Sequence, residues 1–500
     1  MFKQNLARTC SIFLIAFFPG KAATQTNPLV ITAAAPVVTQ SPLVITGVTV
    51  IDMVRPKPKP DMTVIIEGNR IKSITRSRRV HIPKDARVID GRGKFLVPGF
   101  WDMHVHALRA ERVNYFLPLL VANGVTGIRD MGTTAEGFAA LPQLRQAIAT
   151  GTRIGPRIIA AGRILDGARP AVPDNSIPFG SPVEARQIVR SLKQGGADFI
   201  KPYDGVPRDS YFAIIDEAKR LHIPVAGHVP NPITAFEASN AGQKSFEHLA
   251  NILRSCSTLS PSEIDERMRA RLKPDSKPND TSAIPTRIAV RTRIELDTYS
   301  ERKCHQLFAR FVSNKTWQVP TLAVKHALTY VDSIMLRDDP QSKYIPRATL
   351  ERWQPENNPF LKYRTPEFIE MRKKLYQKEV ELVRVMHKAG VKFLAGSDSP
   401  ALYTYPGFSL HDELGLLVDA GFTNFEALLA ATRNPAVYLN LANELGTIQE
   451  RKLADLILLD GDPLKNIANT KRISVVIVDG RYLSKEMLEK MLADTVTGAQ

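Results

Sequence analysis

Phe100-Trp101-Asp102-Met103-His104-Val105-His106 is the stretch of sequence that decides the fold. It follows Val97-Pro98-Gly99, and its apolar residues predict a short buried strand. Because side chains at positions i and i+2 of a strand point to the same face, His104 and His106 are expected to project together. Two imidazoles on one face form a potential metal chelate, whereas two hydrogen-bonded or surface histidines are the ordinary alternative. Further ligands at matching places elsewhere in the chain decide between these interpretations.

Length and charge bound the class of protein. The chain has 500 residues and 44% hydrophobic content, which suits one barrel-sized domain and a smaller one. Lys and Arg exceed Asp and Glu by 17. Since the basic residues are spread along the chain without a groove-reading motif, no nucleic-acid partner is expected. A basic surface-binding protein, the remaining alternative, would associate with nucleic acid or anionic lipid in a salt-sensitive manner and would need no metal.

The first 23 residues have the pattern of a secretory signal peptide. Lys3 and Arg8 precede an apolar run over residues 10–18, and small residues follow at Ala22-Ala23. The apolar run is too short to span a bilayer, so no stable membrane span is expected. The sequence therefore predicts a secreted or periplasmic protein.

Two cysteines, Cys256 and Cys304, remain once the signal peptide is removed. In an oxidising compartment they could form one disulfide. The sequence leaves open whether they come within bonding distance.

Both ends of the chain carry short β-rich runs. Glycine-centred turns separate stretches of β-branched residues, which is typical of a small β-sandwich. The runs lie at residues 43–51, 63–71 and 86–91, and again at 454–461 and 473–480. We therefore predict one discontinuous β-sandwich domain formed by residues 42–97 and 440–485.

Residues 98–439 alternate between strand-like and helix-like segments, which predicts an α/β fold with a parallel sheet. The expected strands lie at 100–106, 127–132, 157–162, 198–203, 224–228, 245–248, 317–322 and 391–398. Eight strands close a (β/α)8 TIM-like barrel. Residues 252–381 exceed what two βα units need, so we predict a helical insertion around the seventh strand. It is either a lid or a surface embellishment.

Ligand-capable side chains recur at the ends of the expected strands, where barrels of this type build their active sites. They are His104 and His106 on strand one, Lys201 on strand four, His228 on strand five, His248 on strand six and Asp398 on strand eight. Each one alone has an ordinary explanation as a surface cation, a core histidine or a helix cap. Six of them on one rim predict a functional site.

This set of residues resembles the metal-dependent amidohydrolase superfamily, in particular its imidazolonepropionase-like and Xaa-Pro-dipeptidase-like branch with a carboxylated lysine. The resemblance covers residues 43–483. It rests on Val97-Pro98-Gly99, His104-Val105-His106, Lys201, Gly227-His228, Glu247-His248-Leu249, Gly396-Ser397-Asp398, Ser409-Leu410-His411-Asp412-Glu413-Leu414 and Ala430-Ala431-Thr432-Arg433-Asn434-Pro435-Ala436.

The resemblance implies a role for each ligand. His104, His106 and Asp398 would hold one divalent ion, and His228 and His248 the second. Imidazole ligands suit zinc. N6-carboxylation of Lys201 by CO2 would turn a cation into an anion that bridges the two metals, so this lysine favours two ions over one. A metal-bridging hydroxide would attack the substrate carbonyl, with Asp398 as the acid/base.

The implied function is a binuclear hydrolase that cleaves an amide C–N bond in a dipeptide-like (Xaa-Pro or similar) or N-acyl amino acid substrate. Cyclic amide, lactone or ester hydrolysis on the same scaffold is the alternative, and a metal-binding module without turnover is another. The basic chain suits a small-molecule substrate with a free carboxylate. Tyr203 and His411 are candidate substrate contacts or else packing residues. Homo-oligomer formation stays an open question.

Overall fold

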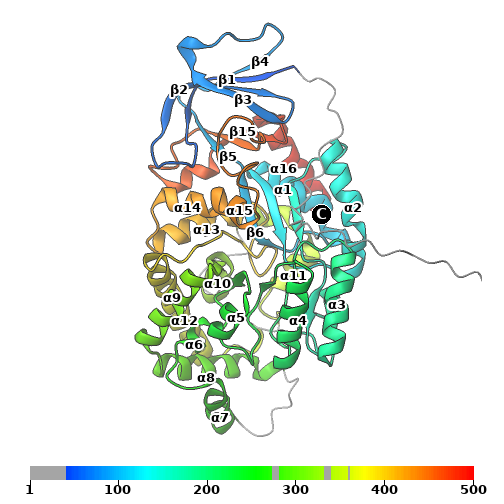
Figure 1. The fold of residues 1–500 in the computed structure, drawn as a ribbon, viewed down its shortest axis with the longest axis vertical. Helices are drawn as coiled ribbons and strands as arrows, with labels where there is room; N and C mark the ends of the chain where they lie inside the picture. Colours follow the sequence, from blue (N-terminus) through cyan, green and yellow to red (C-terminus); the bar gives the residue numbers. More distant parts are fainter. Residues whose placement is uncertain (1–40, 273–280, 332–338, 359–360, 500) are drawn as a thin grey trace, which may run out of the picture.

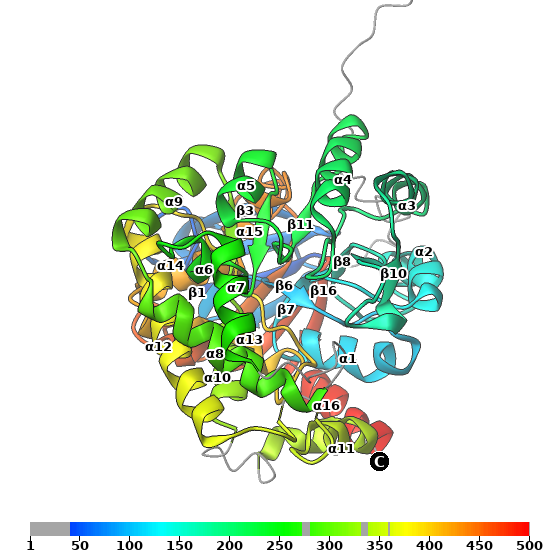
Figure 2. The ribbon, with the colours of Figure 1, turned by 90° about the horizontal axis from the view of Figure 1, so that it is seen from below.

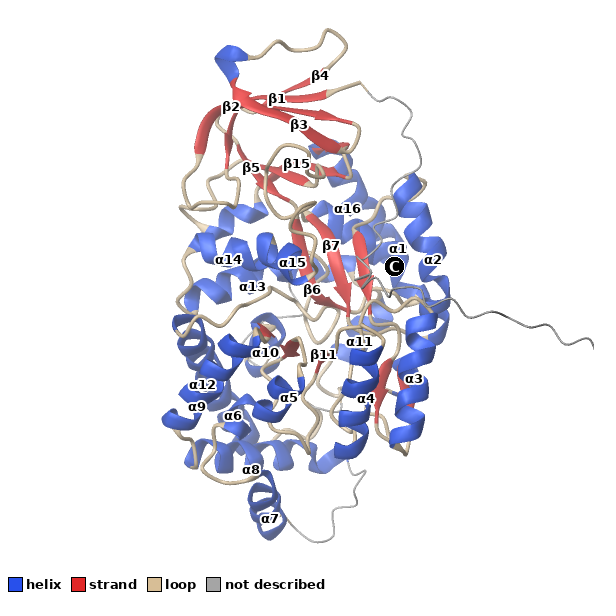
Figure 3. Cartoon of the chain, viewed as in Figure 1, coloured by secondary structure: helices blue, strands red, loops and turns tan. Residues whose placement is uncertain are grey.

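The computed structural model describes residues 41–272, 281–331, 339–358 and 361–499. The predicted signal peptide, residues 1–23, lies outside the described residues. Figure 1 shows a sheet domain at the top, a region of strands and helices in the middle and a group of helices at the bottom. Strands and helices alternate through the middle region (Figure 3), so the predicted α/β class is confirmed. Within the described residues, no helix combines the length and apolar character needed to cross a bilayer.

The sheet domain joins the two ends of the described chain. Its strands are β1 (Leu43–Val50), β2 (Lys59–Glu67), β3 (Arg70–Arg76), β4 (Arg87–Asp90) and β5 (Phe95–Pro98), followed much later by β14 (Leu456–Leu459), β15 (Ile473–Val478) and β16 (Arg481–Ser484). They form one sheet in the order β16-β15-β14-β5-β1-β2-β3, with β4 on β1. The strands from both ends of the chain join in one path, because β5 pairs with β1 along one edge and with β14 along the other.

The sheet curls so that its two ends touch. The β2–β3 turn at Gly68-Asn69 meets the β15–β16 turn at Asp479-Gly480, and Asn69 donates a hydrogen bond of 3.0 Å to Asp479. Gly480 has a φ of +75°, and a Cβ there would lie 2.1 Å from the Gly68 carbonyl oxygen, so only glycine fits. The curled sheet encloses an apolar core that includes Ile45 and Leu456.

Parallel strands form a closed circuit in the middle of the molecule. The paired strands are β6 (Phe100–Val105), β7 (Val125–Asp130) and β8 (Arg157–Ala160), and then β11 (Ala226–Gly227), β12 (Ser245–Glu247) and β13 (Trp317–Val319). Single bridges join these groups: Ile200 pairs with Val225, Gln318 with Phe393, and Ser399 with Val105. Asp198 also donates from its backbone to Ala160. We call this circuit the strand ring.

Helices surround the strand ring (Figure 2). They are α1 (Ala110–Ala122), α2 (Ala135–Thr150), α3 (Pro182–Gln194), α4 (Arg208–Arg220), α5 (Ala235–Ala241), α13 (Phe408–Asp419), α14 (Asn424–Ala431) and α15 (Arg433–Tyr438), while α16 (Lys485–Ala499) packs on α1. Helix α3 shows why the sequence folds this way. Ser181 caps its first turn, Pro182 occupies the first helical position, and Ala185, Val189 and Leu192 form its buried face. The short β9 (Ile164–Asp166) and β10 (Ser176–Pro178) lie in the loop before α3.

A helical insertion flanks β13, and its helices α7 and α8 lie at the end of the molecule away from the sheet domain, whereas α10 and α11 lie nearer the middle (Figure 1). Before β13 come α6 (Ile252–Ser255), α7 (Pro261–Arg271), α8 (Ile284–Asp297) and α9 (Glu301–Asn314); after it come α10 (Leu322–Thr329), α11 (Arg347–Trp353) and α12 (Pro366–Lys388). Helix α12 packs against α8 and α10. The insertion therefore lies beside the carboxyl ends of the ring strands.

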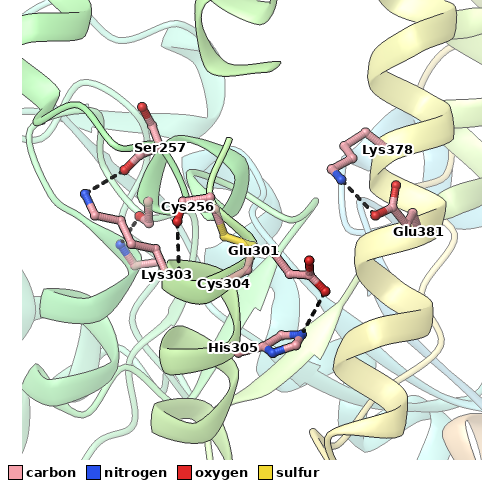
Figure 4. Close-up of a disulfide and its surroundings, with 11 residues drawn as sticks. Cys256, Ser257, Glu301, Lys303, Cys304, His305, Lys378 and Glu381 are labelled. Carbon is pink, nitrogen blue, oxygen red and sulfur yellow. Dashed lines mark hydrogen bonds and ion pairs between the residues drawn. A yellow bond between two sulfur atoms is a disulfide. The ribbon is translucent and has the colours of Figure 1, made fainter. Parts of the chain in front are cut away.

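A disulfide between Cys256 and Cys304 joins the end of α6 to α9 (Figure 4). Both cysteines are fully buried, and their Cα atoms lie 4.8 Å apart. Ser300 donates from its backbone to the Cys256 carbonyl over 2.8 Å, and Lys303 donates to the Ser257 carbonyl over 2.7 Å. This cross-link ties the beginning of the insertion to the helix that precedes β13.

Candidate metal centre

Three predicted ligands converge at the carboxyl end of β6. His104 is fully buried on β6, His106 follows that strand, and Asp398 lies in the ring segment beside it. The Nε2 atoms of His104 and His106 lie 3.3 Å and 3.6 Å from Oδ1 of Asp398. One ligand atom from each of the three fits within 4.8 Å of the others, a geometry that could hold one metal ion.

The remaining predicted ligands continue this group. Nδ1 of His248 lies 3.8 Å from Asp398 Oδ2, and the His248 ring centroid lies 4.4 Å from that of His104 and 4.9 Å from that of His228. Lys201 is buried, and its Nζ lies 5.6 Å from the centroid of the Tyr203 ring, which stacks on His228. The structure therefore brings all six predicted side chains to one end of the strand ring.

Strained backbone turns place several of these side chains. His248, Asp398 and Thr321 have φ values of +57°, +58° and +49°, which are uncommon for residues other than glycine. Asp398 is fixed in this conformation because its backbone N–H donates to the His104 carbonyl over 2.8 Å. Backbone strain of this kind is retained where surrounding contacts enforce it, and it concentrates at functional sites.

Each of the four imidazoles engages its Nδ1 atom with a protein acceptor. His104 donates to Glu247 Oε2 (2.9 Å), His106 to the Gly132 carbonyl (2.9 Å), His228 to Asp204 Oδ1 (2.8 Å) and His248 to Thr321 Oγ1 (2.7 Å). The Thr321 hydroxyl donates to the Pro320 carbonyl, so it accepts from His248. Every ring therefore carries its proton on Nδ1 and presents the Nε2 lone pair, the arrangement found in metal-ligating histidines.

The donor set fits a divalent cation. Nε2 of His104 is fully buried and has no hydrogen-bond partner among the described residues, although buried polar atoms are rarely left unpaired. Burial, together with nearby positive charges, holds the pKa values of His104, His106 and His248 well below their usual range. These imidazoles are therefore neutral, as metal ligation requires.

Lys201 and Asp398 influence each other electrostatically. Burial lowers the pKa of Lys201, although the carboxylates of Asp398, Glu247 and Asp130 oppose this effect. Burial raises the pKa of Asp398, while Lys201 opposes it. The lysine amine is thus more readily neutral than an exposed one, and the carboxyl group can exchange a proton near neutral pH.

Sequence reasoning gave no role to the residues that hold the ligands in place. Arg129 on β7 donates from Nη2 to both carboxylate oxygens of Glu247, each over 2.9 Å, and from Nε to the Met103 carbonyl over 2.7 Å. Asp102 accepts from Ser397 and from the His104 backbone, which couples β6 to the segment carrying Asp398. The i, i+2 spacing of Asp102 and His104 was a usable signal for the contact between the Asp102 carboxylate and the His104 backbone. Nothing in the sequence pairs Arg129 with Glu247.

The two candidate substrate residues have different positions. Tyr203 lies beside the ligands, with its ring stacked on His228 at 4.0 Å between centroids. His411 is buried on α13, where Nδ1 contacts Thr470 Oγ1 and Nε2 contacts the Asn123 carbonyl. The prediction that His411 contacts substrate is wrong, because both of its ring nitrogens are occupied by protein groups.

Residues 95–483 match the sequence pattern of the Amidohydrolase family. The chain belongs to this family. It is accordingly an enzyme, a hydrolase that acts on carbon–nitrogen bonds.

Individual relatives are more distant. Among curated proteins, a dihydroorotase of Anaeromyxobacter dehalogenans (strain 2CP-C) is 32% identical over 113 residues, which are 21% of this chain and 25% of that protein. The match therefore spans a quarter of that relative's length. Solved structures share the fold over most of the chain. A Xaa-Pro dipeptidase with bound methionine has a TM-score of 0.64 at 20% identity, covering 89% of this chain and all of that one. A bottromycin amidohydrolase has a TM-score of 0.70 at 21% identity, and the match covers 91% of this chain and 90% of that one.

Proposed function

We propose that this protein is a binuclear metal-dependent amidohydrolase that cleaves the amide C–N bond of a dipeptide-like or N-acyl amino acid substrate with a free carboxylate. The observation that carries the proposal is the group formed by His104, His106 and Asp398, which could hold a metal ion, with the rings of His248 and His228 next to it and every imidazole Nδ1 engaged by a protein group. The similarity of the fold to a Xaa-Pro dipeptidase supports the substrate class. We infer that the strand ring is the predicted (β/α)8 barrel.

The ligands divide between two ions in this proposal. His104, His106 and Asp398 would hold one, and His228 and His248 would hold the other, with zinc as the ion that suits imidazole. The Nζ atom of neutral Lys201 would add to CO2, forming a new C–N bond and releasing one proton, and the resulting carbamate would supply an anionic ligand in place of a cation. The lowered pKa of Lys201 supports this reaction, because only the neutral amine is nucleophilic. Bound divalent ions supply Lewis acidity and a water of lowered pKa.

The side chains of the protein carry out the proton transfers and the positioning. Asp398 accepts the proton of the attacking water and returns it to the leaving nitrogen. Glu247, held by Arg129, keeps His104 in the required tautomer. Tyr203, stacked on His228, orients the substrate beside this centre.

We also propose export to the periplasm or the cell exterior, with residues 1–23 as the signal peptide. The Cys256–Cys304 disulfide supports this location, since structural disulfides persist in oxidising compartments. Mass spectrometry of the mature N-terminus after expression in a bacterial host tests it, and a retained Met1 in a cytoplasmic fraction would contradict it.

The activity is tested with purified full-length mature protein. Zinc content is measured by elemental analysis, and hydrolysis is assayed on L-alanyl-L-proline, an N-acetyl amino acid, a cyclic amide and an ester. We expect zinc-dependent cleavage of one of the first two. Preferred turnover of the cyclic amide or the ester would make that compound's class the substrate class, in place of dipeptides and N-acyl amino acids. The absence of both metal and turnover would overturn the proposal.

A further inference from the structure

Ionisable side chains gather inside the helical insertion, beside the metal centre. They come from α8, α10 and α12, which pack together (Figure 2). This group, called the insertion cluster, consists of Arg291 and Glu295 on α8, Lys325 on α10, and Arg372 and Glu379 on α12. Its cations outnumber its carboxylates by three to two. Glu295, Arg372 and Glu379 are buried, and the Lys325 side chain is 13% exposed. Burial of unbalanced charge is costly unless a counter-ion is bound.

The backbone of α10 connects the insertion cluster to the metal centre. Thr321, which accepts from His248, is the N-cap of this helix, and the backbone N–H of Lys325 donates to the Thr321 carbonyl over 3.3 Å. Lys325 therefore lies one helical turn from a residue in contact with a predicted metal ligand. One turn further on, the Thr329 hydroxyl accepts from Arg372 over 3.3 Å.

The donors of the insertion cluster are incompletely paired within the described residues. Lys325 Nζ forms one hydrogen bond, of 2.6 Å to Glu379 Oε1, although an ammonium has three donors. The Nε atoms of Arg291 and Arg372 are buried without hydrogen-bond partners, and Arg372 is only 8% exposed. Glu295 lies 3.5 Å from Arg291 Nε without a hydrogen bond, and Glu379 Oε2 is also unpaired. Donors predominate among the unpaired atoms, so an anion with two acceptor oxygens fits.

The field of the insertion cluster reaches both sides of the metal centre. Burial raises the pKa of Asp204, but its partner His228 and also Arg291 bring that pKa below the usual value. Burial raises the pKa of Asp398, and Lys325 is among the cations that oppose this. The geometry that brings the insertion cluster next to the metal centre is the single turn of α10 between Thr321, which contacts His248, and Lys325.

We propose that Arg291, Lys325 and Arg372 bind the substrate carboxylate, so that the helical insertion selects substrates ending in this group. This inference rests on the proposed amidohydrolase function and adds the residues that determine its specificity. Arg291 is the entry point, since its side chain is 38% exposed while the other two lie deeper. A guanidinium matches a carboxylate with paired, charge-assisted hydrogen bonds.

The test compares an acid with its amide. L-alanyl-L-proline and L-alanyl-L-prolinamide are assayed with zinc-loaded wild type, Arg291→Gln and the control Arg293→Gln. Arg293 lies on the same helix and pairs with Glu367 at the surface. We expect Arg291→Gln to lower kcat/KM for the acid about 10- to 100-fold, because it loses charge-assisted hydrogen bonds, and to leave the amide within about twofold. An equal fall for both substrates, or no fall, would overturn the inference.

Two further measurements keep the test decisive. The double variant Lys325→Gln/Glu379→Gln removes both charges of the buried pair without leaving one uncompensated, and we expect the same selective loss. Calorimetric titration with N-acetyl-L-proline and N-acetyl-L-prolinamide reads the site without turnover. If the wild type hydrolyses neither L-alanyl-L-proline nor L-alanyl-L-prolinamide, the proposed function fails. The carboxylate site is still supported in that case if the wild type binds N-acetyl-L-proline more tightly than N-acetyl-L-prolinamide and Arg291→Gln abolishes this difference. If the wild type hydrolyses both dipeptide substrates but does not distinguish the free acid from the prolinamide, only this inference fails.

Discussion

Glu247 accepts a hydrogen bond of 2.9 Å from Nδ1 of His104, and both residues are fully buried. The same carboxylate receives Arg129 on both oxygens, so a cation on β7 fixes an anion on β12, which fixes an imidazole on β6. This series of contacts crosses the interior of the strand ring. It makes the orientation of one predicted metal ligand, His104, depend on Arg129, with which it shares only the Glu247 carboxylate.

Replacing Glu247 by Gln is expected to weaken zinc binding about 10- to 100-fold, because the amide no longer stabilises the Nδ1–H tautomer of His104 with a full charge. Competition with a chromogenic chelator measures the affinity. Glu370→Gln is the matched control, since Glu370 lies exposed on α12 in an i, i+4 pair with Lys374. Equal zinc affinity in wild type and Glu247→Gln would show that the contact does not orient the ligand.

Asp398→Asn is expected to reduce kcat about 100- to 10,000-fold, because the amide cannot accept the proton of the attacking water. Turnover of L-alanyl-L-proline and zinc content are measured together, since loss of one ligand also weakens metal binding. Asp412→Asn, which removes a surface carboxylate paired with Lys471, is expected to behave as wild type. Substantial activity in Asp398→Asn at full zinc occupancy would assign the proton transfer to another group.

The Cys256–Cys304 cross-link closes a loop with a sequence separation of 48 residues. Replacement of both cysteines by serine is expected to lower the free energy of unfolding by about 2–4 kcal/mol, since the unfolded chain regains the entropy of that loop. Urea unfolding with and without dithiothreitol measures this. The reductant should destabilise the wild type and leave the double variant unchanged; equal midpoints for oxidised wild type and variant would contradict the prediction.

Local signals in the sequence located the helices well. Helix-like segments between the expected strands were predictable because an amphipathic face marks both α3 and α4, and the Ser181 cap also marks the start of α3. The expected strands at 198–203 and 391–398 form only isolated bridges. Pro202 lacks an N–H, so the first of these cannot form a regular ladder. The joining of the two chain ends in one β-rich domain was predicted, but the strand order of the curled sheet was not, since the local pattern does not say which strands pair with β5.

The grouping of the candidate ligands was predictable from the sequence, whereas the residues that support them were not. A barrel collects side chains at the carboxyl ends of its strands, so position along each strand was enough to predict that His104, His228 and Asp398 lie in one group. The Arg129–Glu247 pair spans 118 residues and depends on which side chains face each other across the ring interior. His411 was misplaced because nearness in sequence to strand eight says nothing of the direction in which α13 turns its side chains.

Arg157 connects the strand ring to the sheet domain and gives the last prediction. Its guanidinium donates to Asp455 over 2.7 Å and to Asp479 over 2.6 Å. Burial alone would raise the pKa of Asp479, but the charge and hydrogen bond of Arg157 hold it below the ordinary 3.8. A lowered carboxyl pKa contributes stability that is present above about pH 4 and is lost as the pH falls through the folded-state value.

Arg157→Met is expected to lower the free energy of unfolding at pH 7 by about 3 kcal/mol, because buried Asp455 loses its cation and Asp479 keeps only Arg481. The deficit should shrink as the pH falls toward 4, since protonation begins to remove the uncompensated charges in the variant, whereas the wild type loses the contribution of Asp479 only below about pH 4. Urea unfolding at pH 7, 5 and 4 measures both trends, with Arg186→Met as a control for a more exposed arginine paired with Asp216. A deficit that stays constant across this range would mean that Arg157 acts through packing and not through its charge.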